Sequence, residues 1–306
     1  MDLYLPIANV SVNAAIIVVL GGLVGFLTGM FGVGGGFLTT PLLIFYGIPP
    51  SVAVASAATQ ITGASVSGAL SYWRRGGVDP QMGMVLVVGG IVGTALGSAL
   101  FRWLQQVGQI DTVIAILYVL LLGSIGTLML RESLGALGHK AFTPRKPAGI
   151  RRHHPLIAAL PGRFRFYRSG LYISPMGPLL LGFATGILTV FLGVGGGFVM
   201  VPAMIYLLGM STAVVVGTSL FQIVFVTAAA TLVHATWSRT VGIVLAGLLL
   251  LGSVVGAQLG ARPAGKVKAE YLRLGLAILV LLVAGRVAIG LGWRPDEIFT
   301  IQGPDA

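Results

Sequence analysis

A glycine-rich hexapeptide, Gly-Val-Gly-Gly-Gly-Phe, occurs twice in the chain, at Gly32–Phe37 and Gly193–Phe198. Glycine costs about 1 kcal/mol relative to alanine inside a helix, so each cluster is expected to break the apolar helix that contains it. A helix that restarts after such a break presents unpaired N–H groups and the positive end of its dipole, which together suit an anion. The candidate binding residues at the two breaks are Gly34, Gly35, Gly36, Phe37, Gly195, Gly196, Gly197 and Phe198.

Two glutamines that follow the glycine clusters offer a second kind of ligand. Gln60 and Gln222 lie well inside apolar segments, with Thr59 beside the first and Thr218 shortly before the second. Amides and hydroxyls donate hydrogen bonds without bringing a charge into hydrocarbon, so these four side chains are the remaining candidates for binding an oxyanion. Two alternatives stay open: polar side chains commonly hydrogen-bond membrane helices together, and glycines let hairpin tips pack closely.

Ionisable side chains are scarce in the apolar segments, which bears on the class of solute. Asp79, Asp111 and Glu270 fall at expected helix ends, and His234 is expected to be a packed residue near the end of its segment. A carboxylate-based proton relay is therefore disfavoured. A cation site would need carboxylates, so neutral donors and helix ends favour an anionic solute.

Enzymatic and metal-binding motifs are missing from the sequence. The chain has no cysteine and no Walker sequence, and His153 and His154 are adjacent, which is not a metal-ligand spacing. The Gly32-x-Gly34 pattern lacks the preceding strand and the acidic residue of a dinucleotide-binding fingerprint. We expect no enzymatic activity, no cofactor and no metal.

The composition indicates a helical membrane protein. Of 306 residues, 56% are hydrophobic and 9% are charged, whereas soluble domains carry about 25% charged residues. Continuous apolar runs long enough to cross about 30 Å of hydrocarbon recur along the chain. We predict an all-α polytopic protein of about 8–10 helical segments, multi-pass in the bilayer of the cell (inner) membrane.

The apolar segments recur in the same order in two halves of the chain. Expected helices cover 14–31, 38–48, 52–73, 82–103 and 112–130, then 177–192, 199–208, 213–235, 241–260 and 271–291. Gly25-Phe26-x-Thr28-Gly29 matches Gly182-Phe183-x-Thr185-Gly186, which indicates an internal duplication. The domains are then a first transmembrane repeat over 1–130, a basic loop over 131–175 and a second repeat over 176–306.

Positive charge distinguishes two topologies. If each half crosses the membrane four times, the halves are parallel and Arg262, Lys266 and Lys268 lie outside. If each glycine break is instead the tip of a helical hairpin followed by three transmembrane helices, the repeats have inverted topology and these residues join Arg74 and Arg75 in the cytoplasm. The inverted scheme obeys the positive-inside rule better. The run 38–48 also gives only about 16 Å of helix, too short to span.

The connection between the halves is strongly basic. Nine of the 19 Lys and Arg residues fall between Arg131 and Arg168, which predicts a cytoplasmic loop with some attraction to anionic lipid. Within it, Arg163–Arg168 alternates basic and aromatic residues before a Ser169-Gly170 turn, which predicts a short strand pair at the membrane surface. Such alternation can also stack nucleic-acid bases, but a position beside apolar helices favours the surface interpretation and no nucleic-acid partner.

The doubled motif resembles that of the sulfite exporter TauE/SafE family of membrane permeases. The residues that carry the resemblance are Gly25–Gly29, Gly32–Phe37, Gly182–Gly186, Gly193–Phe198, Pro41, Pro202, Gln60 and Gln222. The similarity extends from Ala14 to Leu291 and is interrupted by a basic loop longer than is usual in that family. It implies export of sulfite or of small organosulfonates such as sulfoacetate.

Residue types and resemblance together predict a secondary transporter. It would export a small sulfur-containing anion by alternating access, with the anion held at the N-termini of the broken helices. Two rivals stay open, a passive anion channel with the same lining and a membrane-embedded assembly subunit without transport activity. The sequence leaves the oligomeric state open, including a homo-oligomer.

Overall fold

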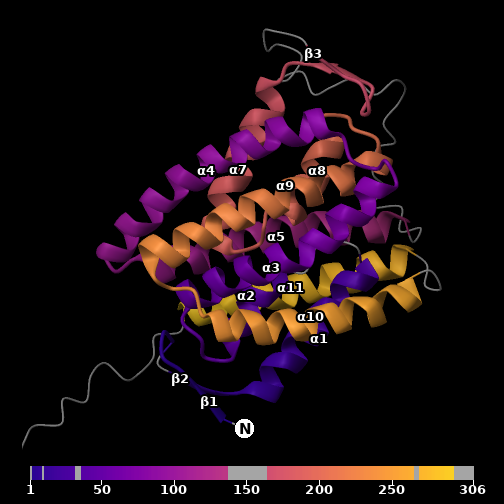
Figure 1. Ribbon diagram of the computed structural model, residues 1–306. Coiled ribbons are helices and arrows are strands. Elements are labelled where there is room, and N and C mark those ends of the chain that lie inside the picture. The colour runs from indigo at the N-terminus through magenta and orange to yellow at the C-terminus, as the bar shows by residue number, and fades with distance from the viewer. Residues whose placement is uncertain (1, 9, 32–35, 137–163, 265–268, 293–306) are drawn as a thin grey trace, which may run out of the picture.

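The computed structural model describes residues 2–8, 10–31, 36–136, 164–264 and 269–292, and these are predominantly helical (Figure 1). In the first half the helices are α1 (Ala14–Phe31), α2 (Gly36–Phe45), α3 (Pro50–Arg74), α4 (Pro80–Gln106) and α5 (Ile110–Ala136). In the second half they are α7 (Met176–Leu192), α8 (Gly197–Tyr206), α9 (Thr212–Val233), a π-helical turn (His234–Ser238), α10 (Ile243–Ala264) and α11 (Ala269–Gly292). The expected all-α membrane architecture is confirmed at this level, and the helices have nearly the bounds expected from the apolar runs.

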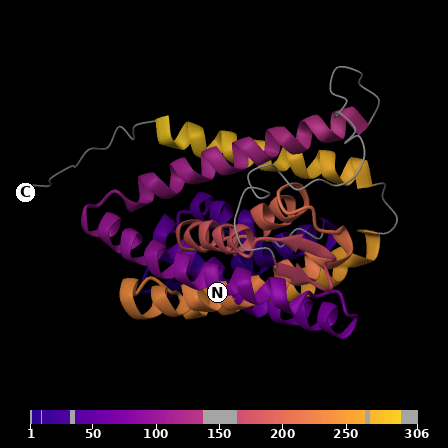
Figure 2. The ribbon, with the colours of Figure 1, turned by 90° about the horizontal axis from the view of Figure 1, so that it is seen from above.

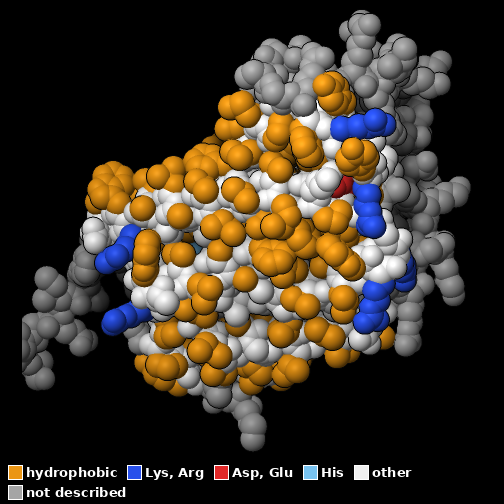
Figure 3. Space-filling model, turned by 45° about the horizontal axis from the view of Figure 1, so that its top comes forward, with side chains coloured by type: hydrophobic (Ala, Val, Ile, Leu, Met, Phe, Trp, Pro, Cys, Tyr) orange, Lys and Arg blue, Asp and Glu red, His pale blue; other side chains and the backbone are white. Residues whose placement is uncertain are grey.

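Helix lengths separate spanning segments from hairpin arms. By length and composition, three described helices can cross a membrane: Pro80–Gln106, Ile110–Gly135 and Val214–Ser238. The helices α2 and α8 have 10 residues each, or about 15 Å, so neither can span the hydrocarbon alone. On the face shown in Figure 3, hydrophobic side chains fill a broad band and Lys and Arg lie at its two ends, as expected for a lipid-facing surface.

Helix α4 packs closely and in parallel against α7. A Cβ added to Gly89 would overlap the carbonyl of Leu179, and one added to Gly93 would overlap that of Phe183. The same closeness appears from the other side, where a Cβ on Gly186 would overlap the carbonyl of Gly90. Because the residue numbers rise together along both helices, the two run in the same direction.

Helix α1 packs against α10 in the same manner. A Cβ at Gly21 would overlap the backbone of Leu249, and one at Gly25 would overlap that of Ser253, so α1 and α10 are also parallel. Each pair joins a helix of the first half to a helix of the second. Glycine supplies the close approach in both pairs, as small residues commonly do between membrane helices.

The remaining long helices form two further pairs. Thr59 and Thr62 of α3 hydrogen-bond Thr231 and Thr227 of α9, at 3.4 and 2.8 Å between hydroxyl oxygens, so α3 and α9 run antiparallel. Helices α5 and α11 lie side by side along one flank of the molecule (Figure 2). Each of the four helix pairs therefore joins one helix of the first half to one helix of the second half.

The predicted strand pair in the basic loop is confirmed. Strands β3 (Phe164–Phe166) and β4 (Leu171–Ile173) are antiparallel, with Phe166 opposite Leu171. Their buried side chains pack into a cluster with Met82 of α4 and Met204 of α8, so the hairpin is docked on the helices.

Asp79 fixes this hairpin to the start of α4. Its carboxylate caps the helix by accepting from the amides of Gln81 and Met82 at 3.1 and 3.2 Å. The same carboxylate accepts from the amide of Ser169 at 2.9 Å and from the Ser169 hydroxyl. Arg168 adds a hydrogen bond to the carbonyl of Val78 at 2.9 Å.

A second strand pair was not expected from the sequence. Strands β1 (Asp2–Leu5) and β2 (Val10–Asn13) are antiparallel and precede α1. Leu5 and Val12 are buried in a cluster with Leu43 of α2 and Leu249 of α10. Packing against these helix ends stabilises two strands that are too short to give a sequence signal.

The close contact of α4 and α7 predicts the effect of a single methyl group. Gly186→Ala should lower the free energy of unfolding by about 1–3 kcal/mol, because the new Cβ meets backbone that cannot move aside. The matched control is Gly123→Ala in α5, where a Cβ meets nothing within 4 Å and helix propensity should add up to about 1 kcal/mol. Denaturant titration of the purified protein in detergent measures both, and equal effects would contradict the packing.

The docked hairpin leads to a second prediction. Asp79→Ala removes a helix cap and the acceptor for Ser169, and should cost about 2–4 kcal/mol of unfolding free energy. Ser211→Ala is the control, because Ser211 precedes α9 without a side-chain capping bond and its loss should be nearly neutral. A loss for Asp79→Ala no larger than for Ser211→Ala would show that the carboxylate does not hold the hairpin.

Candidate functional site

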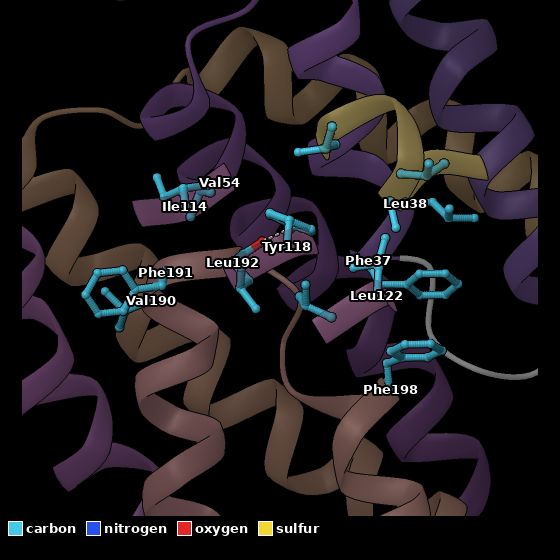
Figure 4. Packing of buried hydrophobic residues seen from close by; sticks show 14 of the residues in the cluster. Phe37, Leu38, Val54, Ile114, Tyr118, Leu122, Val190, Phe191, Leu192 and Phe198 are labelled. Atoms are coloured by element: carbon cyan, nitrogen blue, oxygen red, sulfur yellow. Dashed lines mark hydrogen bonds between the residues drawn. The ribbon is translucent and has the colours of Figure 1, made fainter. Parts of the chain in front are cut away.

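The starts of α2 and α8 lie against each other. The rings of Phe37 and Phe198 are stacked, with centroids 4.3 Å apart and planes 12° apart, and both side chains are buried (Figure 4). A Cβ at Gly36 would lie 3.0 Å from the carbonyl oxygen of Val194. The structure thus brings together Gly36, Phe37 and Phe198 from the two glycine motifs, while Gly34 and Gly35 lie outside the described residues.

The second break is a turn that only glycine adopts without strain. Gly193, Gly195 and Gly196 have φ values of 65°, 69° and 73°, in the left-handed region. The carbonyl of Gly196 accepts from the amides of Val199 and Met200, at 3.1 and 2.7 Å, and so starts α8. Within the described part of the chain, the amides of Gly195 and Gly196 have no hydrogen-bond partner.

The end of α7, in contrast, has its carbonyls occupied. The carbonyl of Leu192 accepts from the Tyr118 hydroxyl of α5 and from the Thr40 hydroxyl of α2, the latter at 3.1 Å (Figure 4). The Val190 carbonyl lies 3.1 Å from Nε2 of His234, whose ring packs edge-on against Phe101. His234 is therefore a fully buried residue that contacts the end of α7, in agreement with the expected packing role. The negative end of α7 is neutralised by side chains, while the positive end of α8 keeps donors available.

Gln60 lies next to the residue that contacts both breaks. The Ile61 side chain would overlap a Cβ added at Gly36. It also lies 3.1 Å from the position that a Cβ on Gly195 would occupy. Gln60 itself is buried, and its Oε1 has no hydrogen-bond partner among the described residues.

Gln222 is fully buried with both polar atoms unpaired. Neither Nε2 nor Oε1 has a partner within the described chain, and Nε2 lies 3.3 Å from the position of a Cβ at Gly90 of α4. Gly90 packs on α7 near Gly186. In the same stretch of α7, the Cβ of Thr185 lies 3.0 Å from the position that a Cβ on Gly196 would occupy. Gln222 and the second break therefore flank the same part of α7. Buried amides usually have partners, so Gln222 is a polar group that the described chain leaves unsatisfied.

The surroundings of these groups are neutral. The sequence has no Lys, Arg, Asp or Glu from Leu3 to Trp73 or from Ser169 to Ser238, which covers both hairpins, α9 and nearly all of α3. No cluster of His, Asp or Glu that could hold a metal occurs in the described ranges. A surface hollow at the end of α3 is lined by Leu70, Ser71, Arg74 and Arg75, apart from the glycine breaks.

Comparison with known proteins decides the family. The family model described as sulfite exporter TauE/SafE matches residues 17–287, nearly the whole chain. The protein belongs to the TauE/SafE family. It is accordingly a membrane transporter rather than an enzyme, as the sequence predicted.

Relatives of this TauE/SafE chain bear transporter names. It is 27% identical, over 87% of its length and 96% of the relative, to the probable membrane transporter protein YjnA of Bacillus subtilis. It is 29% identical, over 90% of its length and 93% of the relative, to a probable membrane transporter protein of Xylella fastidiosa. No solved structure matches the chain significantly.

The two threonines predicted for the TauE/SafE site lie in different places. Thr59 donates to the Ala55 carbonyl at 3.0 Å and hydrogen-bonds Thr231 in the α3–α9 contact. Thr218 accepts from the amide of Asp79 at 3.0 Å, so its hydroxyl is engaged at the turn before α4 and not at the glycine breaks. Gly197 begins α8 beside Phe198.

Other residues near the breaks were missed by the sequence analysis. Ile61 lies close to both Gly36 and Gly195, and Thr227 and Thr231 complete a line of hydroxyls across α3 and α9. The spacing of Thr227 and Thr231, four residues apart and soon after Gln222, is a signal that could have found this line. Ile61 is indistinguishable by type from the apolar residues around it.

Contact between the two breaks can be tested by a double-mutant cycle. Phe37→Leu and Phe198→Leu should each destabilise the protein, and together by less than their sum, with a coupling of about 0.5–1.5 kcal/mol in unfolding free energy. Phe37→Leu combined with Phe221→Leu serves as the control, because Phe221 contacts Trp73 and Phe225 elsewhere, stacked on the first and edge-on to the second, and the two changes should add. Additive effects for Phe37 and Phe198 would mean that the rings do not meet.

Proposed function

We propose that this TauE/SafE protein is a secondary transporter that exports a small sulfur-containing anion, sulfite or an organosulfonate such as sulfoacetate, by alternating access. The anion is held at the N-termini of α2 and α8, where Gly34–Phe37 and Gly195–Phe198 supply backbone donors. Gln60 and Gln222 orient it, whereas the Thr59 and Thr218 hydroxyls are engaged in contacts away from the anion. The family supports transport and suggests the substrate; the site chemistry supports an anion.

One observation carries the proposal. Two helix starts from different halves converge, as the stacked Phe37 and Phe198 rings indicate, and the helices packed against them, α3 and α9, carry two buried glutamines with unpaired amide atoms. An unsatisfied buried polar group costs about 1–3 kcal/mol. A bound ligand that pairs with these amide atoms would remove this cost, which supports a binding role for the two glutamines.

The helix contacts support an inverted-topology repeat. If α7–α11 repeat α1–α5 with opposite orientation in the membrane, α1 must run parallel to α10, α4 parallel to α7, and α3 antiparallel to α9. The glycine and threonine contacts described above have these directions. Parallel repeats would instead make α3 and α9 run in the same direction, which their threonine contacts contradict. An inverted arrangement is what alternating access around a central site commonly uses.

Orientation in the cell membrane follows from charge. The positive-inside rule places three basic regions on the cytoplasmic side of the inner membrane: Arg74, Arg75 and the connection 131–175. Arg102 and Arg239 then lie on the opposite side. Transport outward from the cytoplasm then begins on the side that carries the cationic residues, which attract anions.

Replacing the unpaired amide should separate stability from function. Gln222→Leu should leave unfolding free energy unchanged or raised, because it removes a buried unsatisfied group, and should reduce sulfite uptake into proteoliposomes about tenfold or more at subsaturating substrate. Gln258→Leu is the control, since that glutamine of α10 is exposed and its change should leave uptake intact. If Gln222 only joined helices, Gln222→Leu would destabilise the protein instead.

Counterflow distinguishes a carrier from its rivals. Labelled sulfite should enter vesicles preloaded with unlabelled sulfite faster than it enters empty vesicles, because the binding site of a carrier returns to the outside faster when it carries substrate. Flux without this acceleration would identify a passive anion channel. A folded protein that transports none of the tested anions would instead favour the assembly subunit.

A further inference from the structure

The helices that meet at the glycine breaks provide no full charge to a bound anion. The uncharged stretches Leu3–Trp73 and Ser169–Ser238 contain a single ionisable imidazole, that of His234, which is held at the end of α7 by Val190. Arg286 of α11 is exposed and lies over the Phe45 ring, 5.6 Å from its centroid, at the far end of α2. Dipoles alone must therefore replace the water that an anion loses.

Dipolar binding discriminates strongly by charge. The solvation free energy of an ion rises with the square of its charge, so a dianion loses about four times as much as a monoanion of the same size on leaving water. Helix ends and amides return only part of that loss for either ion. A neutral site of this kind thus favours singly charged forms.

Gln222 adds a requirement on hydrogen-bonding type. An amide has a donor end and an acceptor end, and neither end of Gln222 has a partner in the described chain. Exchanging the assigned nitrogen and oxygen positions leaves this conclusion unchanged, because both atoms are unpaired. A guest that satisfies Gln222 must both accept and donate a hydrogen bond.

The unpaired Oε1 of Gln60 strengthens this requirement. An anion with acceptors only, such as the sulfite dianion or sulfate, would place its oxygens near carbonyl oxygens of the same sign. A monoanion that keeps a proton can donate to an amide oxygen and still accept from the Gly195 and Gly196 amides.

We propose that the site selects singly charged oxyanions that retain a hydrogen-bond donor. This refinement rests on the proposed function of the same site. Among sulfur compounds it assigns hydrogen sulfite in preference to the sulfite dianion, and hydroxyalkyl sulfonates in preference to plain or doubly charged sulfonates. Of the two substrates named above it therefore favours sulfite, as hydrogen sulfite, over sulfoacetate, which is doubly charged at neutral pH. The cytoplasmic arginines Arg74 and Arg75 attract all of these anions, and the neutral interior chooses among them.

The test uses the full-length protein in proteoliposomes. Initial sulfite uptake is measured at several pH values on both sides of the second ionisation of sulfurous acid, with no pH gradient. Rates should fall on one curve when plotted against the hydrogen sulfite concentration, and KM in total sulfite should rise with pH. The profile should persist in His234→Gln, which shows that the titrating group is the substrate.

Three sulfonates of similar size test charge and donor separately. Inhibition of hydrogen sulfite uptake should be strongest for isethionate, about tenfold or more weaker for ethanesulfonate, which lacks the hydroxyl, and weakest for ethane-1,2-disulfonate, which is doubly charged. Gln222→Leu should remove the preference for isethionate over ethanesulfonate, and Gln258→Leu should keep it.

The outcomes separate the two levels of the proposal. Uptake that follows the sulfite dianion, or equal inhibition by all three sulfonates, overturns the selectivity and leaves an anion transporter. Absence of flux for every anion, in protein that is folded by thermal unfolding, overturns the transport function and the selectivity with it.

Discussion

A helix that breaks inside a membrane must find partners for its freed backbone groups, and this constraint organises the molecule. At the end of α7 the carbonyls of Val190 and Leu192 are met by His234, Tyr118 and Thr40, two of which come from the first half of the chain. The break in the second half of the chain is thus completed in part by helices of the first half. The amides of Gly195 and Gly196, in contrast, have no partner in the described chain, and the proposed anion site uses these donors.

Glycine has two structural roles in this protein, one at the helix break and one between packed helices, and together they account for its abundance. At the breaks, positive φ values at Gly193, Gly195 and Gly196 demand it. Along α4 and α7, glycines with ordinary helical geometry allow backbones to approach where a methyl group would overlap a carbonyl. The first kind shapes the site and the second holds the two helices that flank Gln222. Site geometry and helix packing are therefore coupled through one residue type.

Much of this could be predicted from the sequence, because it follows from local rules. Helix positions, the break at 193–196 and the β3–β4 pair depend on hydropathy, glycine content and a turn signal, and the structure has them where they were expected, while residues 32–35 of the first break lie outside the described residues. The pairing of β1 with β2, the stack of Phe37 on Phe198 and the role of Ile61 depend on which helices meet, which no short segment specifies. Likewise, Gln60 and Thr218 look alike as polar residues in apolar helices. Only the folded arrangement gives Thr218 a partner in Asp79 and leaves Oε1 of Gln60 without one.

The reciprocal contacts of α1 with α10 and of α4 with α7 also limit how such a protein can have originated. A half-length ancestor would carry one member of each pair and would expose the glycine faces of both. Two copies inserted in opposite orientations would cover those faces, with α1 of each lying along the α4 of the other. If the halves are inverted copies, as proposed above, a single chain holds together what two separate half-length copies would have to assemble by mass action, and its two halves can diverge in sequence.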